Sequence, residues 1–307
     1  MALYPASNFP NGFGNGVTIR NIPIEIMPEG KVHWVNSGAA NNSNGSYAKP
    51  WATIATAISK ADEYDTIMIA AGHSETLTSS SFVVDKALTI IGQGRGSRVP
   101  TFTSTSAAAT GTVSITDADV TISNIRLVAG YSGGSAAAIT IAAVGDFCTL
   151  DNIVCRDGAT NAVEWLTHVS VATTVTDLTI QNCDFVGLIS GSMTNSILFA
   201  GTTSNVRITG NYIDVDSSDS TIDHDAAKAT SILVAHNLIL NQDTTAADKF
   251  CVELEASSTG LVAYNGTSYA NAGATSMIGE AAFFIENYGG NTAGSSGELD
   301  PAAVAIP

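Results

Sequence analysis

Charge, and basic charge above all, is scarce in this sequence. Charged residues make up 13% of the 307 residues, and 28 carboxylates against 12 lysines and arginines give a formal net charge of −16. Nucleic-acid backbones and anionic membrane surfaces bind proteins through basic patches, so we expect neither as a partner. An acidic polysaccharide is also disfavoured as a substrate, unless a divalent metal bridges it to the protein.

Long apolar runs and cysteine motifs are absent as well. No run approaches the roughly 18 apolar residues of a membrane span, and Met1 to Pro10 has neither the basic start nor the apolar core of a secretory signal. We therefore expect the protein to fold in the cytoplasm. Because the cysteines show no CxxC spacing, we predict no disulfide, metal or cofactor and interpret all four as reduced packing residues: Cys148, Cys155, Cys183 and Cys251.

A short apolar pattern that ends in asparagine recurs along most of the chain, as in Val120–Asn124 and Leu178–Asn182. Alternate apolar side chains would point inward and stack on the next repeat. Asparagine suits the sharp corner that follows, because it tolerates the left-handed conformation. The spacing, roughly 26 to 30 residues except at the last step, predicts a ladder of stacked corners: Asn124, Asn152, Asn182, Asn211, Asn237, Asn265 and Asn287.

This repeat predicts an all-β fold, a single-stranded right-handed parallel β-helix. A leucine-rich repeat is the main competitor, but its repeats are shorter and richer in leucine, whereas this chain has β-branched residues and no helical half-repeat. We expect an N-terminal arm over 1–30, a β-helix over 31–288 with an entry cap at 31–75, and a flexible glycine-rich tail over 289–307.

The entry cap carries a resemblance to known β-helices. Pro50–Ile58 predicts a short helix with Trp51, Ile54 and Ile58 on one face, and Asp65–Gly72 predicts a strand. This order resembles the start of the pectate-lyase-like, or pectin-lyase-like, superfamily, in which such a helix caps the coil. The resemblance implies a fold and no chemistry. The matching residues are Gly45, Ser46, Pro50, Trp51, Thr53, Ile54, Ala57, Ile58, Asp65, Thr66, Ile67, Ile69 and Gly72.

The best candidate for chemistry is the acidic segment Asp214–Asp225, with five aspartates and His224; Asp184, Glu253 and Glu255 fall on other repeats. Paired carboxylates can hydrolyse glycosides, and clustered ones can bind calcium. The spacing does not fit an EF-hand, and no nucleophile triad, phosphate loop or HExxH motif is present. We interpret the segment as a solvated acidic loop and predict no catalytic residues and no enzyme; metal or glycan binding there stays open. Arg126, Arg156 and Arg207 are expected to pair locally, for example with Asp151 or Asp184, and His236 to be a turn residue.

The arm needs a partner for its apolar residues, either another protein or its own body. Phe9–Pro23, followed by Gly30–Val35, is similar to the opening of phage-encoded β-helix proteins, in which a short arm binds the particle and a trimeric β-helix projects outward. The resemblance implies a structural virion protein of a tailed bacteriophage. This would be a capsid decoration or cement protein, a homotrimer on the capsid surface that is assembled in the host cytoplasm and bound to the major capsid protein. The alternative is a phage tailspike or a polysaccharide lyase or hydrolase that cuts a surface glycan. The expected capsid-binding residues are Phe9, Phe13, Val17, Ile19, Arg20, Ile22 and Ile24.

Overall fold

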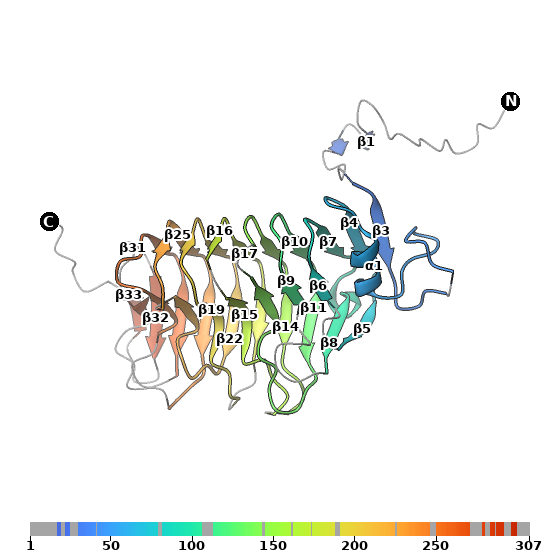
Figure 1. Cartoon of the computed structure of the whole chain (residues 1–307). Coiled ribbons are helices and arrows are strands. Elements are labelled where there is room, and N and C mark those ends of the chain that lie inside the picture. Colours follow the sequence, from blue (N-terminus) through green and yellow to red (C-terminus); the bar gives the residue numbers. More distant parts are fainter. Residues whose placement is uncertain are drawn as a thin grey trace.

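Three long β-sheets form the sides of one elongated coil in the computed structural model of the chain (Figure 1). Residues 17–19, 22–24, 30–40, 42–78, 82–105, 113–142, 145–160, 162–172, 174–187, 191–224, 226–245, 250–270, 278–279, 283–285, 287–291 and 296–299 are described. Within this part, no helix is long and apolar enough to span a membrane.

The strands of each sheet stack in chain order. The first sheet contains β3 (Val32–Val35), β4 (Thr66–Ile69), β7 (Thr89–Gly92), β10 (Thr121–Ser123), β13 (Thr149–Asp151), β17 (Thr179–Gln181), β21 (Arg207–Thr209), β25 (Ile232–Ala235), β28 (Gly260–Ala263) and β31 (Phe283–Ile285). The second sheet contains β5 (Ser74–Leu77), β8 (Thr101–Ser104), β11 (Arg126–Ala129), β14 (Val154–Arg156), β18 (Asp184–Val186), β22 (Tyr212–Val215), β26 (Leu238–Asn241), β29 (Gly266–Tyr269), β32 (Asn287–Asn291) and β33 (Ser296–Leu299). The third sheet contains β6 (Phe82–Val84), β9 (Val113–Ile115), β12 (Ile139–Ile141), β15 (Thr167–Val171), β19 (Asn195–Phe199), β23 (Ile222–His224), β27 (Val252–Leu254) and β30 (Ile278–Gly279). A minor sheet joins β16 (Val175–Thr176), β20 (Thr203–Ser204) and β24 (Ala229–Thr230).

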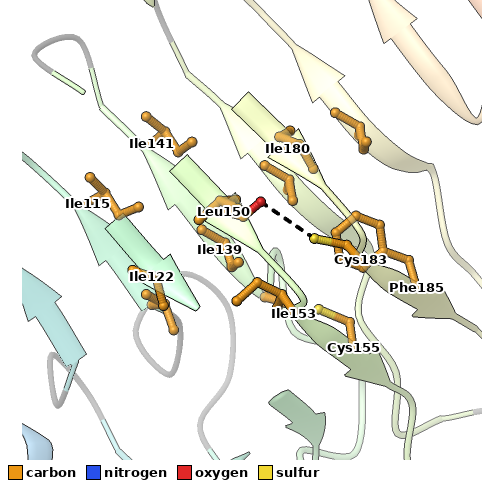
Figure 2. Packing of buried hydrophobic residues seen from close by; sticks show 14 of the residues in the cluster. Ile115, Ile122, Ile139, Ile141, Leu150, Ile153, Cys155, Ile180, Cys183 and Phe185 are labelled. Atoms are coloured by element: carbon orange, nitrogen blue, oxygen red, sulfur yellow. Dashed lines mark hydrogen bonds between the residues drawn. The ribbon is translucent and has the colours of Figure 1, made fainter. Parts of the chain in front are cut away.

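Parallel pairing between successive turns produces the coil. The chain visits the three sheets in rotation, so that each strand lies beside the strand one turn earlier. Ile122, Leu150 and Ile180 are consecutive partners in the first sheet and are fully buried (Figure 2). Full burial of such a side chain contributes about 1.5–3 kcal/mol, so the apolar stack is the main source of stability. The predicted all-β parallel β-helix is confirmed.

The four cysteines belong to this interior, as predicted. All are free and buried. Burial raises the pKa of Cys148 to about 11 and that of Cys183 to about 12. The thiols therefore stay protonated at neutral pH, which makes them poor nucleophiles and poor metal ligands. Cys183 also donates a weak hydrogen bond from Sγ to the carbonyl of Leu150, 3.8 Å away (Figure 2).

A short helix, α1 (Ile54–Lys60), covers the N-terminal end of the coil (Figure 1). Thr53 caps it, because its hydroxyl accepts a hydrogen bond from the Thr56 amide at 3.3 Å. At the other end, Lys86 Nζ donates two 2.9 Å hydrogen bonds to the last carbonyls. The buried face consists of Ile54, Ala57 and Ile58.

Trp51 departs from the predicted helical face, because the helix begins three residues after it. Its backbone forms a parallel bridge with Val35, and its N–H donates to the Trp34 carbonyl at 2.7 Å. Its indole Nε1–H donates to His33 Nδ1 at 3.4 Å, while His33 Nε2 lies 2.8 Å from Asp65 Oδ2. Trp51 therefore connects the loop after β3 to the first strand, and its partly buried side chain packs against the hydrophobic core.

The predicted asparagine ladder proves to be two ladders. Asn124, Asn152 and Asn182 occupy the corner itself, with φ of 55°, 53° and 54°. Their side chains are partly or largely exposed. Asn152 Nδ2 donates to Asn124 Oδ1 at 2.9 Å, and Asn182 Nδ2 donates to Asp151 Oδ1 at 2.8 Å. Asparagine in this outer ladder lowers the cost of the left-handed corner, and its side chains stay at least partly exposed.

Asn211, Asn237, Asn265 and Asn287 form an inner ladder and are buried. The left-handed corner is taken by the preceding residue, Gly210, His236 or Tyr264 at the first three of these asparagines. The asparagine then follows the corner and lies buried just before the next strand of the second sheet. The Nδ2 groups of Asn211, Asn237 and Asn265 each donate to the Oδ1 of the next asparagine at 2.9 Å, and Asn287 Nδ2 donates to the Val262 carbonyl at 2.9 Å. The assignment of all seven asparagines to one set of corners is therefore wrong for these four.

The two ends of the chain differ from the body. In the arm, β1 (Val17–Ile19) and β2 (Ile22–Ile24) form an antiparallel hairpin, while Phe9, Phe13 and Arg20 lie outside the described residues. Part of the predicted flexible tail is ordered, because β33 pairs antiparallel with β32. This pairing covers an edge of the second sheet that would otherwise be open.

Candidate functional site

A polar cluster on the outer face of the second sheet contains two of the predicted candidate carboxylates. We call Arg156, Asp184, Tyr212, Asp214 and Gln242 the second-sheet cluster. Asp184 of β18 is the register partner of Tyr212 of β22, and Asp214 lies two residues further along β22. Because alternate residues of a strand share a face, the three side chains project on the same side. The coil therefore brings together residues from separate repeats.

Each carboxylate of the second-sheet cluster has donor partners. Arg156 forms an ion pair with Asp184 through Nη2, and its Nη1 donates to the Asp184 carbonyl at 2.9 Å. Tyr212 donates its hydroxyl hydrogen to Asp214 Oδ2 at 3.1 Å, and Gln242 Nε2 donates to Asp214 Oδ1 at 3.0 Å. The expected local pairing of Arg156 with Asp184 is thus observed. Partial burial, the hydrogen bond to Asp214 and the nearby carboxylates raise the pKa of Tyr212, so its hydroxyl remains a donor at neutral pH.

The acidic segment Asp214–Asp225 is not the solvated loop that we expected. Ser217, Ser220, Thr221, Asp223 and His224 are buried. The reason is that residues 222–224 form β23 of the third sheet, between β19 and β27. Polar partners compensate the burial.

Several neutral donors and acceptors hold the buried part of this segment. Asn195 Nδ2 donates to Asp223 Oδ2 at 2.9 Å. His224 Nε2 lies 2.8 Å from Thr203 Oγ1, and the His224 ring stacks on Phe199 with centroids 4.8 Å apart. The segment therefore serves the packing of the coil, and Asp225 lies outside the described residues.

Other predicted acidic residues are dispersed. Glu253 accepts a hydrogen bond from Ser220, and Glu255 Oε2 accepts from the Ser257 amide and hydroxyl at 2.9 and 2.6 Å. These hydrogen bonds lower the pKa of Glu255. Across the described ranges, no group of three or more histidine, cysteine, aspartate or glutamate side chains is placed to hold a metal ion.

Two histidines of the coil, His236 and His168, differ in burial. His236 sits at a corner with φ of 57°, as expected for a turn residue, and stacks on Tyr264 at a centroid distance of 5.2 Å. His168 on β15 is fully buried, and its Nδ1 lies 3.0 Å from Ser196 Oγ. Burial, with a smaller effect of the Arg156 charge, lowers the pKa of His168 to about 3. Sequence reasoning did not single out His168.

Sequence reasoning also missed an aromatic groove beside the entry cap, where Trp34 of β3 meets Tyr47 of the following loop. The two rings are 4.9 Å apart between centroids and nearly perpendicular, at 80°. One signal was available, since the alternation in Val32-His-Trp-Val35 puts Trp34 on the opposite face from the buried Val35.

Comparison with known proteins supports the fold. No family model and no curated protein matches the sequence. Among solved structures, the chain is similar to a rhamnogalacturonan lyase, with a TM-score of 0.53 and 11% identity over 78% of this chain and 69% of that one. It also matches a pectin methylesterase from Aspergillus niger, with a TM-score of 0.42 and 12% identity over 90% of this chain and 93% of that one. A pectate lyase, Pel9A, matches with a TM-score of 0.35 and 10% identity over 90% and 82% of the two chains. These three proteins are named as lyases and an esterase, and none as a virion protein. At 11% identity the likeness to the rhamnogalacturonan lyase shows the fold alone, a parallel β-helix.

Proposed function

We propose that the protein is a structural virion protein of a tailed bacteriophage, a capsid decoration protein that stabilises the head shell from the capsid surface. The observation that carries the proposal is the separation of arm and body. Among the described strands, β1 and β2 pair only with each other. An isolated two-stranded hairpin is marginally stable at best, so a partner surface would stabilise it. We assign that surface to the major capsid protein.

We infer that three copies stand side by side on the shell. The support is a line of exposed large side chains across second-sheet strands towards the C-terminal end of the coil, Tyr212, Leu238 and Tyr288, in which Gly266 is the register partner of both Leu238 and Tyr288. Tyr212 and Leu238 are register partners on adjacent strands of the second sheet, and Leu238 also lies against Gly266. Contiguous exposed apolar residues favour an interface, and closed symmetry is usual for homo-oligomers.

Deletion of residues 1–28 should abolish binding to capsid shells assembled from the same genome without this protein. The reason is that the arm carries the proposed contacts, whereas the coil begins at β3 and is capped by α1. Co-sedimentation of the purified protein with such shells, followed by electron microscopy of the pellet, measures the binding. Full-length protein should pellet and decorate the shell surface.

The control shows that the deletion variant is still folded, and it uses the purified variant in the absence of shells. The variant should keep the circular dichroism of the full-length protein and the mass of a trimer in solution. Undiminished binding by the folded deletion variant would show that the arm is not the attachment element. A full-length protein that is monomeric at every concentration would contradict the trimer.

Cleavage of a surface glycan, as by a tailspike, lyase or hydrolase, is the second candidate function. The observation that favours it is Asp184 Oδ1 in the second-sheet cluster, a buried atom that has no hydrogen-bond partner among the described residues. We nevertheless propose that the protein is not an enzyme. Arg156, Tyr212 and Gln242 are hydrogen-bonded to the cluster's two carboxylates, which does not leave an acid and a base facing an open substrate position.

Incubation with polygalacturonate or host capsular polysaccharide, with and without calcium, should release no reducing ends and no unsaturated products. The matched variants are Asp184→Asn and Asp214→Asn in the cluster and Asp62→Asn at an exposed site paired with Lys31. Cleavage by the natural protein that is lost in either cluster variant and kept in Asp62→Asn would establish the enzyme.

A further inference from the structure

A groove of about 620 Å³ lies on the outer side of the first turns of the coil, at the junction of the first strands with the entry-cap loop. Its residues come from four separate parts of the chain, which the coil brings together. Trp34 is on β3, Gln93 follows β7, and Arg98 ends the short 3₁₀ helix η1 (Gly96–Arg98). We call this the cap groove, and it is lined by Trp34, Asn36, Tyr47, Pro50, Ala70, Ala71, Gln93 and Arg98.

Backbone hydrogen bonds fix the loop wall of the cap groove. The Trp34 amide donates to the Gly45 carbonyl at 2.7 Å, and the Asn36 amide donates to the Trp51 carbonyl at 2.8 Å. Ser46 and Lys49 are paired across the tip that carries Tyr47. Tyr47 is therefore held in place although its side chain is 77% exposed. An aromatic residue held in solvent by its backbone is available for a ligand.

The opposite wall is set by a close backbone approach. Gly94 has φ of 101°, and a Cβ there would lie 2.4 Å from the Arg98 carbonyl and 3.0 Å from Ala71 Cβ. Only glycine fits both the conformation and the space. The Arg98 carbonyl also accepts a 2.7 Å hydrogen bond from the Gly72 amide. The backbone of η1 is thereby anchored against the turn after β4, beside the two small alanines of the groove floor.

The charge of the cap groove is opposite to that of the whole protein. The chain has a net charge of −16, yet none of the described residues that line the groove is a carboxylate, and Arg98 is exposed there. Among the described residues, no ion pair or hydrogen bond engages the Arg98 guanidinium. Asn36 Oδ1 accepts from the Gly38 amide at 2.9 Å, which leaves its NH₂ group as a donor. The groove thus combines two aromatic rings, one cation and two side-chain amides.

We propose that the cap groove is a non-catalytic binding site for a carboxylated sugar unit of a glycan. Trp34 and Tyr47, whose rings are nearly perpendicular, form an apolar corner against which a C–H face of the sugar ring packs. Arg98 binds the carboxylate with the paired hydrogen bonds that a guanidinium offers. Asn36 and Gln93, which can both donate and accept, bind hydroxyl groups. A nucleic-acid strand fits less well, because its backbone needs several cations along one track and the groove has one.

A glycan array with neutral, sulfated and carboxylated members tests the site in the full-length protein. We expect binding confined to carboxylated glycans. Titration of the best binder should show affinity about tenfold or more weaker for Tyr47→Ala and Arg98→Ala, the loss expected when a stacking ring or a charge-assisted hydrogen bond is removed. The matched controls are Tyr64→Ala and Arg95→Ala, which remove an exposed ring and a neighbouring cation outside the groove, and both should bind like the natural protein.

Three outcomes would overturn the site. They are binding to no carboxylated glycan on the array, equal binding of neutral glycans that Arg98→Ala leaves unchanged, and equal losses in the groove variants and their controls. The site is independent of the attachment proposal, because deletion of residues 1–28 should leave glycan affinity unchanged. Failure of glycan binding and failure of capsid attachment can therefore be told apart.

Discussion

Replacement of Asn237 by alanine should lower the free energy of unfolding by about 3–5 kcal/mol, because it breaks the inner ladder at its middle. Asn237 Nδ2 donates to the Ile208 carbonyl and to Asn265 Oδ1, both at 2.9 Å. Its Oδ1 accepts from the amide and the Nδ2 of Asn211, again at 2.9 Å. Alanine leaves the Asn211 amide without this partner and removes one hydrogen bond each from the Ile208 carbonyl, Asn211 Nδ2 and Asn265 Oδ1, although Asn211 Nδ2 keeps the Ile180 carbonyl and Asn265 Oδ1 keeps the Asn237 amide. Water cannot replace the lost bonds in a packed interior.

Asn182→Ala is the matched control from the outer ladder. Asn182 is exposed and donates one side-chain hydrogen bond, to Asp151. Alanine there should cost about 1–2 kcal/mol, mainly for the left-handed corner, and Asn182→Gly should recover most of that loss. Denaturant unfolding followed by circular dichroism gives both values. Equal losses at Asn182 and Asn237 would contradict the division into two ladders.

The sequence was sufficient to predict the coil but not the switch between ladders. The first repeats reach asparagine in five residues, as in Val120–Asn124, whereas Val206–Asn211 takes six. The extra residue is Gly210, which takes the left-handed corner and moves the asparagine into the buried position after it. The length difference was visible in the sequence. Its consequence depends on register between turns, which local pattern does not specify.

The candidate sites were less predictable, because they depend on which turns become neighbours. Asp184 and Tyr212 lie far apart in sequence and become partners only through the pairing of β18 with β22. In the same way, the cap groove joins Trp34 to Arg98 across two turns of the first sheet. The acidic segment was misread for a related reason. Its aspartates suggested solvent, but Asp223 lies on a strand whose neighbours supply Asn195 as a donor.

The stability of the protein should fall steeply between neutral pH and pH 4 because His168 is buried without a charge partner. Its Nδ1 pairs with Ser196, its ring stacks on Phe185 at 5.2 Å, and its Nε2 has no hydrogen-bond partner among the described residues. Burial lowers the pKa of His168 from 6.5 to about 3, and the positive charge of Arg156 acts in the same direction. A proton on this ring is therefore strongly disfavoured in the folded state.

The direction in which pH changes the stability follows from proton binding by the folded and unfolded states. Between pH 6.5 and pH 3 the unfolded chain binds a proton at His168 that the folded protein does not, so lower pH favours unfolding. The contribution of neutral His168 is fully present above pH 6.5 and is lost as the pH falls towards 3. Near pH 5 the slope should be about 1.3 kcal/mol per pH unit, and the loss at pH 5 relative to pH 8 about 2 kcal/mol. Equilibrium unfolding in urea at several pH values measures this curve.

His168→Gln separates this titration from packing. Glutamine is slightly smaller than histidine and does not ionise. The variant should therefore be less stable at pH 8, while its pH slope near pH 5 falls by about 1.3 kcal/mol per unit. A His168→Gln protein that keeps the full slope would assign the acid sensitivity to other groups. With the predicted result, a single buried imidazole on β15 accounts for about 1.3 kcal/mol per pH unit of the acid sensitivity near pH 5.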